Sequence, residues 1–456
     1  MSEAERALAR RSPAEPAVAG GSGAGTRRRR LVLALCCLLV AVVGLGSYVV
    51  DQRRAVVPLY AGTVAVGAGG IAVEVPDEPD LLLPGTRVLR SAPDAARLAA
   101  EQRRWLAAGS VPSVPELGNT TLLRDALLDL RVLASEHGVA VAGWSQPWHY
   151  VWPRDAALVA AALARTGHND DAEQVISFLQ RVQPQSGHFH ARYLPDGSGI
   201  PDSRGVQLDG LGWALWGMRE VAGRLPASDR GTFVRRHWQL LDRSSKAIPS
   251  VLDPRTGLPP ASPDYWEVAE DEPTLATAAV LHAGLRSAAT LYRYLAADTA
   301  ATTAAQAADE LAESIEVTFA ADGYPRTAGG PADSADLGVA FLLPPFVDRG
   351  ARFDRAVQVW LDSAGPMARQ AGGLAPGGSW RDDGVSWTTA TSSRAMTAAS
   401  LGRRDEAVAW LRWLDEHRTR QGSIPEKVLY DGKPASVAPL AWAAAAVLIG
   451  ASEISG

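Results

Sequence analysis

The chain has 456 residues, of which 47% are hydrophobic and 21% charged, a composition typical of a globular protein. Its formal net charge is −5, and no basic face or nucleic-acid motif stands out, so nucleic acid is not expected as a partner. Walker, dinucleotide-binding and Gly-x-Ser-x-Gly motifs are absent from the sequence, and we expect no cofactor.

An apolar segment near the N-terminus predicts a membrane anchor. Residues 1–30 are rich in Ala, Gly, Ser and Arg, end in four arginines, and are expected to form a disordered cytoplasmic tail. Residues 31–50 carry no charge, and about 20 apolar residues match the thickness of a bilayer core. The arginines before this run place the N-terminus in the cytoplasm and the rest of the chain outside the cell membrane.

The alternative for residues 31–50 is a signal peptide that is cleaved before secretion. Its polar leader would be unusually long, and no small-residue cleavage site follows the apolar run, so an uncleaved anchor is favoured. The only two cysteines, Cys36 and Cys37, lie inside this run. The exported part therefore forms no disulfide, and its stability must come from its core.

Residues 51–90 form, by expectation, a short β-rich juxtamembrane spacer. Thr63 to Val75 alternates between apolar and other residues around a glycine turn, which predicts a hairpin.

From residue 91 to residue 456 the pattern is helical. Apolar residues recur at helical spacing in segments broken by Gly, Pro or Asp, and no sustained strand pattern lies between them, which excludes a parallel α/β sheet. We predict an all-α domain over 91–456 in which helices paired head to tail close into a double-layered barrel, and we expect a monomer. The predicted helices are 91–108, 119–137, 154–166, 169–183, 206–223, 228–248, 274–296, 299–318, 351–372, 386–401, 404–420 and 437–454.

Long connections between these helices hold most of the functional candidates, because long loops in globular folds are usually functional or flexible. They are 138–154, 184–205, 255–273, 373–387 and 421–436. Tryptophans in loops can stack on sugar rings, and these are Trp144, Trp148, Trp152, Trp266, Trp380 and Trp387. Tryptophans in helical segments are expected in core or rim packing instead, and these are Trp213, Trp216, Trp410, Trp413 and Trp442.

Two glutamates in these loops are candidate catalytic groups. Glu267 follows Tyr265 and Trp266, and aromatic faces would desolvate its carboxyl and keep it protonated, as a general acid requires. The alternative is a solvated glutamate at a helix start. Glu426 follows Pro425 in a rigid loop and could activate water as a general base. Its alternative is a surface glutamate paired with the neighbouring lysine.

Arg154 and Asp155 follow Trp152 and Pro153 and predict a polar clamp for vicinal hydroxyls of a sugar. A salt bridge that caps the next helix is the alternative, and the two roles can coexist. His188 and His190 lack a third ligand at zinc-like spacing, so we predict no metal site.

Five strings together resemble glycoside hydrolase family 15, the glucoamylase-like family that includes glucodextranase and trehalase-type relatives. They occur in the family's order and span about 290 residues, and each alone is a weak signal. The strings are YVWPRDAAL (150–158), QLDGLGWAL (207–215), DYWE (264–267), DLGVAFLLP (336–344) and GSIPEK…PASVAPLAW (422–442).

The resemblance implies an (α/α)6 barrel and an inverting exo-acting α-glycosidase whose partner is a carbohydrate. By this analogy Glu267 is the general acid, Glu426 is the general base, and Arg154 with Asp155 holds the terminal sugar. Further substrate-binding residues implied around that sugar are Tyr150, Trp152, Asp209, Tyr265, Trp266, Arg381 and Trp387.

The chain departs from the family pattern at Val268, where many members have a second acidic residue.

From the apolar N-terminal segment and the family resemblance together, we expect a membrane-anchored, extracytoplasmic hydrolase of terminal α-glucosidic bonds. The alternatives are an inactive glycan-binding protein on the same fold and a cell-envelope glycan hydrolase with a substrate other than a glucoside.

Overall fold

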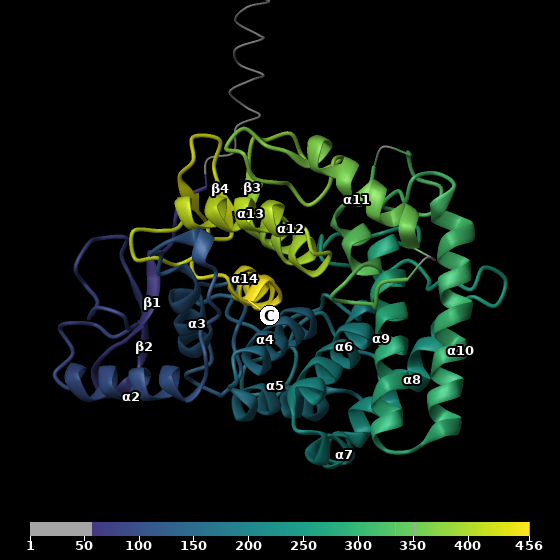
Figure 1. Cartoon of the computed structure of the whole chain (residues 1–456), viewed down its shortest axis with the longest axis horizontal. Coiled ribbons are helices and arrows are strands. Elements are labelled where there is room, and N and C mark those ends of the chain that lie inside the picture. The colour runs from purple at the N-terminus through teal and green to yellow at the C-terminus, as the bar shows by residue number, and fades with distance from the viewer. Residues whose placement is uncertain (1–56, 333, 351–352, 456) are drawn as a thin grey trace, which may run out of the picture. The chain divides into compact units, whose positions relative to one another are not determined.

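Helices alternate along the chain between an inner and an outer ring in the computed structural model, which describes residues 57–332, 334–350 and 353–455 (Figure 1). Each inner element packs against the next, and α14 packs against α4, which closes the ring. The inner elements are α4 (Pro153–Arg165), α6 (Asp209–Arg224), α9 (Leu275–Tyr294), η4 (Leu337–Leu342), α12 (Thr388–Ser400) and α14 (Ala441–Ser455). The outer helices are α3 (Leu122–Leu133), α5 (Asn169–Val182), α8 (Trp238–Val251), α10 (Asp298–Ile315), α11 (Asp354–Met367) and α13 (Arg404–Glu416). This arrangement confirms the predicted (α/α)6 barrel.

The two rings differ in composition because they differ in burial. Almost every residue of α4 is buried and alanine is its commonest residue, whereas α10 buries residues only at helical spacing along one face. Small residues also let the inner helices approach closely. A Cβ atom built on Gly212 of α6 would lie 2.1 Å from the carbonyl oxygen of Val280 in α9, so no side chain fits there.

The fourth inner position is occupied by a short 3₁₀ helix. Asp336 caps η4 by accepting a hydrogen bond from the backbone N–H of Gly338 at 2.8 Å. The hydrophobic side chains of η4 are buried, and η4 packs against α9, α11 and α12. Phe341 of η4 and the nearby Phe346 add two aromatic side chains to the core there.

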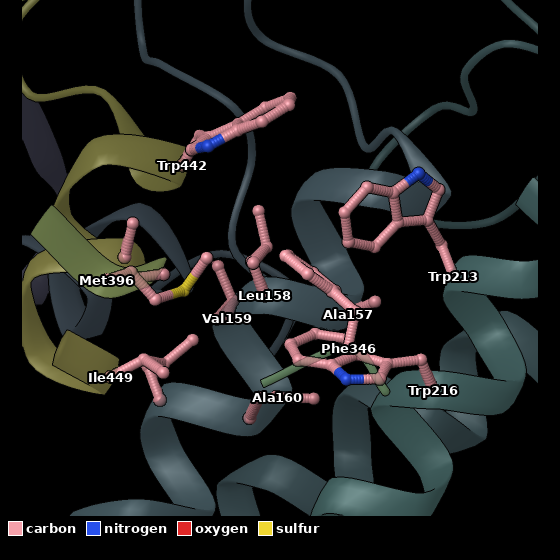
Figure 2. Packing of buried hydrophobic residues seen from close by; sticks show 14 of the residues in the cluster. Ala157, Leu158, Val159, Ala160, Trp213, Trp216, Phe346, Met396, Trp442 and Ile449 are labelled. Carbon is pink, nitrogen blue, oxygen red and sulfur yellow. The ribbon is translucent and has the colours of Figure 1, made fainter. Parts of the chain in front are cut away.

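Aromatic side chains pack together in the core, and Figure 2 shows Trp213, Trp216 and Phe346 among the buried hydrophobic residues. Trp213 makes edge contacts with Trp216, Phe341 and Phe346 at ring-centroid distances of 5.8, 5.2 and 5.5 Å. All four rings are almost completely buried. Edge-to-face aromatic pairs of this kind fill the barrel interior with closely packed side chains.

Two predicted helices differ in the structure. The segment 228–248 is divided at His237 into α7 (Ala227–Arg236) and α8, because His237 leaves the helical backbone conformation. The segment 91–108 is α2 (Ala95–Ala108), which belongs to neither ring. Short helical turns complete the fold: η1 (Ala68–Gly70), η2 (Pro115–Leu117) and η3 (Glu316–Ala320).

The hairpin predicted in the segment 51–90 is present. β1 (Thr63–Val66) and β2 (Ala72–Val75) are antiparallel, with Thr63 opposite Val75. Its side chains join the core of the barrel, and Ala55–Gly456 forms one compact unit, so the hairpin packs on the helical body and does not stand apart as a spacer.

The predicted cytoplasmic tail and membrane-spanning segment lie outside the described residues. Within the described part of the chain, every helix is too short or too polar to cross a bilayer.

Candidate active site

A cavity of about 300 Å³ opens at the end of the barrel where the inner helices begin. The connections that lead into the inner helices are long, and their residues form most of the cavity lining. The lining residues are Ala142, Pro147, Trp148, Trp152, Arg154, Asp155, Arg192, Arg204, Tyr265, Trp266, Glu267, Pro376, Trp380, Trp387, Thr389, Glu426, Lys427, Leu440 and Trp442. Helix N-termini carry partial positive charge, which favours carboxylates at this end of the barrel.

Buried aromatic packing lies behind one part of the cavity lining. Trp442 lines the cavity, and its ring centroid is 6.3 Å from those of both Tyr265 and Trp213. Trp213 belongs to the buried aromatic core (Figure 2).

Arg154 is the central cation of the cavity. It lies in the first turn of α4 and is buried, with its Nη2 donating to Glu267 Oε1 at 3.0 Å. Its Nε lies 3.6 Å from Asp155 Oδ2, and its Nη1 lies 3.6 Å from Asp209 Oδ2. Burial alone would lower its pKa, but the three carboxylates raise the pKa of Arg154 above its ordinary value. The predicted clamp is thus a buried charge cluster built on one arginine.

The two aspartates of this cluster titrate unusually. Burial raises the pKa of Asp155 to about 6; Arg154 opposes the rise, while the charges of Glu267 and Glu426 add to it. Burial likewise raises the pKa of Asp209 to about 7, against the attraction of Arg154. Asp155 lines the same cavity as both glutamates.

Glu267 meets two guanidinium groups, and not only the aromatic faces expected from its neighbours. Oε1 accepts from Arg154, and Oε2 accepts from Arg204 Nη1 at 2.8 Å. Two charge-assisted hydrogen bonds stabilise the ionised carboxylate. The surroundings of this carboxyl therefore include two cations in addition to the aromatic neighbours from which its role was predicted.

The backbone of Glu267 is held in an uncommon conformation. Its φ angle is 56°, in the left-handed region, and its N–H donates to the carbonyl of Asp264 at 2.9 Å in a tight turn. A non-glycine residue in this region costs free energy and persists where the surroundings determine it, often at functional sites.

Arg326 stabilises the turn that contains Glu267. Its guanidinium lies 3.8 Å from the ring centroid of Trp266 and donates to Asp264 Oδ1 at 2.9 Å and Asp336 Oδ2 at 2.8 Å. The Tyr265 hydroxyl donates to the same oxygen of Asp336 at 2.7 Å. The DYWE string and the string that begins at Asp336 thus form one charge network, which explains why both belong to the site.

Glu426 also lines the cavity and is buried, which excludes the surface glutamate considered above. Its Oε1 accepts from Trp148 Nε1 at 3.1 Å, and its Oε2 accepts from the Ser436 hydroxyl at 2.7 Å. Lys427 Nζ lies 3.0 Å from Oε2, so the predicted pairing with this lysine exists inside the cavity. These three donors stabilise a negative charge on Glu426.

A small sheet holds the backbone of Glu426. β4 (Lys427–Val428) begins at the next residue and pairs with β3 (Ser386–Trp387) and β5 (Pro434–Ala435). The Glu426 N–H donates to Val437 at 2.8 Å, and its carbonyl accepts from the Thr388 N–H at 3.0 Å. The base candidate is therefore fixed between two segments that precede inner helices.

The N-terminal hairpin supports the same loop. The hydroxyls of Thr63 in β1 and Ser423 lie 2.7 Å apart, and Ser423 also donates to the buried Asp129 at 3.1 Å. Arg87 pairs with Asp129 and donates to the carbonyl of Gln421 at 3.1 Å. Residues before the barrel thus position the loop that ends in Glu426.

An arc of indoles joins the two glutamates along one wall. Trp266 contacts Trp380 edge to face at 4.6 Å, and Trp380 contacts Trp387 at 5.4 Å. Lys427 Nζ lies 4.4 Å from the Trp387 ring centroid. Because Lys427 follows Glu426 in the chain, this row of indoles extends from Glu267 to Glu426. The Nε1 atoms of these tryptophans and of Trp152 are buried without a hydrogen-bond partner among the described residues, and can donate to a polar ligand.

The structure brings most of the predicted site residues together. Those that line the cavity are Trp152, Arg154, Asp155, Tyr265, Trp266, Glu267, Trp387 and Glu426. Asp209 lies behind Arg154, and Tyr150 lies under Arg192, whose Cζ is 4.3 Å from its ring centroid. Arg381 is exposed, 5.4 Å from the Trp380 ring, and does not line the cavity.

Several cavity residues escaped the sequence reasoning. Trp442 was expected in packing because it lies in a helical segment, yet it lines the cavity. Arg192 and Arg204 lie in the flagged loop 184–205, but no motif marks them. Arg192 and Arg204 are recognised as cavity residues only from their positions in the folded structure.

Val268, which replaces the acidic residue of many family members, is 38% exposed. Glu270, two positions later, pairs with Arg326 and supplies a second carboxylate from this segment. In the described ranges no three His, Cys, Asp or Glu side chains are grouped so that they could hold a metal ion.

Comparisons with known proteins agree with the fold of this chain. Residues 120–219 match the profile of glycosyl hydrolases family 15. Isomaltose glucohydrolase from Kribbella flavida is 24% identical over 393 residues, which cover 74% of this chain and 97% of that protein. A solved wild-type glycosidase is 19% identical with a TM-score of 0.63, covering 77% of this chain and 98% of its own. A bacterial glucoamylase complexed with acarbose is 18% identical with a TM-score of 0.63, covering 80% of this chain and 62% of its own.

Proposed function

We propose that this chain, a glucoamylase-like glycoside hydrolase of family 15, is an inverting exo-α-glycosidase that hydrolyses terminal α-glucosidic bonds. The observation that carries the proposal is that Glu267 and Glu426 line one cavity together with Arg154 and Asp155. Trp442 also lines this cavity and packs against the buried Trp213, and a cavity closed on that side accepts a chain end, which supports exo action. The two carboxyl groups supply the acid and base that inversion requires.

In the proposed reaction Glu267 donates a proton to the glycosidic oxygen while that oxygen leaves the anomeric carbon. Glu426 takes a proton from a water molecule that attacks the opposite face of the sugar. Arg154 and Asp155 hold the sugar hydroxyls, and the buried indole N–H groups supply further donors. The donors around Glu426 suit a base because they stabilise its charge.

Anomer-resolved proton NMR tests the reaction. The full chain is incubated with isomaltose, maltose, trehalose and oligosaccharides of the cell envelope, and the first product anomer is recorded. Isomaltose leads the panel because the relative from Kribbella flavida is an isomaltose glucohydrolase. With isomaltose and maltose, the glucose released from the non-reducing end should appear first as the β-anomer, and its appearance as the α-anomer would show retention and overturn the proposed mechanism. With trehalose, inversion should give one α- and one β-glucose, whereas two α-glucose molecules would show retention. Turnover of an envelope oligosaccharide, with no turnover of the three glucosides, would show that the substrate is a glycan other than these α-glucosides.

We also propose that residues 31–50 anchor the protein in the cell membrane, with the catalytic domain outside and the N-terminus in the cytoplasm. The uncharged run and the arginines before it support this placement. Intact cells that produce the full chain are treated with a protease, and a variant lacking 31–50 serves as the control. The protease should digest the catalytic domain from outside the cell. An N-terminal fragment that contains residues 31–50 should remain in the membrane fraction. A mature protein that begins after residue 50 would establish signal cleavage and secretion instead.

A further inference from the structure

Glu267 has two cationic partners that differ in their surroundings. Arg154 is buried and has Asp155 and Asp209 nearby in addition to Glu267. The Arg204 side chain is 40% exposed and reaches Glu267 Oε2 from the loop before α6. Its other carboxylate contact is Asp202 Oδ2, at 3.6 Å from Nε.

Protonation of Glu267, which the proposed acid role requires, affects these partners unequally. Arg154 keeps two carboxylates, so its charge stays compensated. Arg204 keeps only Asp202, and the same Oδ2 atom already accepts from Arg192 Nε at 3.0 Å and pairs with Arg192 Nη2. Arg204 then loses the nearer of its two carboxylate contacts, the one to Glu267 Oε2 at 2.8 Å. The reactive state therefore calls for a new negative charge beside Arg204.

The position of Arg204 identifies what can bring that charge. Arg204 lines the cavity on the side of Glu267, and the proposed acid lies next to the leaving group. Trp442 and Arg154 are buried parts of the cavity lining, where the terminal sugar would lie, whereas the Arg204 side chain is 40% exposed. On this placement a group carried by the leaving portion of the substrate meets Arg204.

We propose that the preferred substrates are α-glucosides whose leaving group carries a carboxylate, which binds Arg204 and frees Glu267 for protonation. This inference rests on the proposed function, since it assigns Glu267 as the acid. The carboxylate itself takes no part in bond making. The glycosidic C–O bond breaks, its oxygen gains the proton of Glu267, and water adds to the anomeric carbon with loss of a proton to Glu426. Glu267 then regains a proton from solvent.

Two small glucosides of nearly equal size test the inference. Carboxymethyl α-D-glucoside and 2-hydroxyethyl α-D-glucoside differ only in a carboxylate against a hydroxymethyl group. With the full-length enzyme we expect kcat/KM to favour the carboxylate by about 10- to 100-fold, the range of a charge-assisted hydrogen bond. Arg204→Met should bring the ratio close to one, and Arg204→Lys should keep part of it.

Arg255→Met is the matched control. Arg255 is also exposed and also pairs with an aspartate two residues earlier, Asp253, but it lies outside the cavity. This variant should keep the wild-type ratio. Equal turnover of the two glucosides by the wild type, or a preference that survives Arg204→Met, would overturn the inference.

A binding measurement separates the inference from the proposed function. The two sulfur-linked analogues, which resist hydrolysis, are titrated by calorimetry into the wild type and Arg204→Met. Tighter binding of the carboxylate analogue that disappears in Arg204→Met supports the Arg204 site, even if no oxygen-linked glucoside is hydrolysed and the proposed function fails. Equal binding of the two analogues to the wild type would overturn the site, even if neutral α-glucosides are good substrates.

Discussion

Replacing Glu267 by glutamine is expected to lower kcat on an unactivated α-glucoside by about 10²- to 10⁴-fold, the usual contribution of general acid–base catalysis. The glutamine cannot donate a proton to the glycosidic oxygen. With α-glucosyl fluoride, whose leaving group needs little protonation, the same variant should stay within about tenfold of the wild type. Steady-state kinetics on the two substrates measure the difference.

The control for this variant is Glu272→Gln, an exposed glutamate five residues further along the same segment. It should leave both rates unchanged. Since glutamine removes the charge that Arg154 and Arg204 share, thermal unfolding of each variant must show that the fold survives. Unimpaired hydrolysis of the unactivated substrate by a folded Glu267→Gln enzyme would remove Glu267 from the acid role.

Replacing Glu426 by alanine should lower kcat by a similar factor of about 10²- to 10⁴-fold, on α-glucosyl fluoride as well as on unactivated glucosides. Both reactions need an activated water molecule, whatever the leaving group is. Azide should restore turnover because it needs no base and fits the space that the carboxylate leaves. The product should be β-glucosyl azide, identified by NMR, because attack comes from the face opposite the leaving group.

Glu416→Ala provides the control, since Glu416 is exposed at the end of α13. It should show neither the loss nor the response to azide. A Glu426→Ala enzyme that keeps its activity on the fluoride would behave as an acid variant, and the two roles would have to be exchanged. An α-glucosyl azide product would argue against inversion.

The sequence by itself determined the layout of the helices and the loops that carry the site. Helical periodicity is a local property, so most helices are found where the apolar spacing places them. Their long connections are the ones that reach the cavity. The fourth inner position was missed because η4 is only six residues long, too short for a periodic signal. Its place in the ring depends on buried aromatic rings such as Phe341, which the closed barrel brings into the core.

Only the tertiary structure decided the charge environment of the two glutamates. The neighbours of Glu267 in the chain are aromatic, yet its carboxylate binds Arg154 and Arg204, which lie 113 and 63 residues away. Glu426 has a lysine beside it in the sequence, but Trp148 also donates to it from 278 residues away. Side-chain identity and spacing locate a carboxyl group on a loop. Which charges surround it is settled when the ring of helices closes and unrelated loops share one cavity.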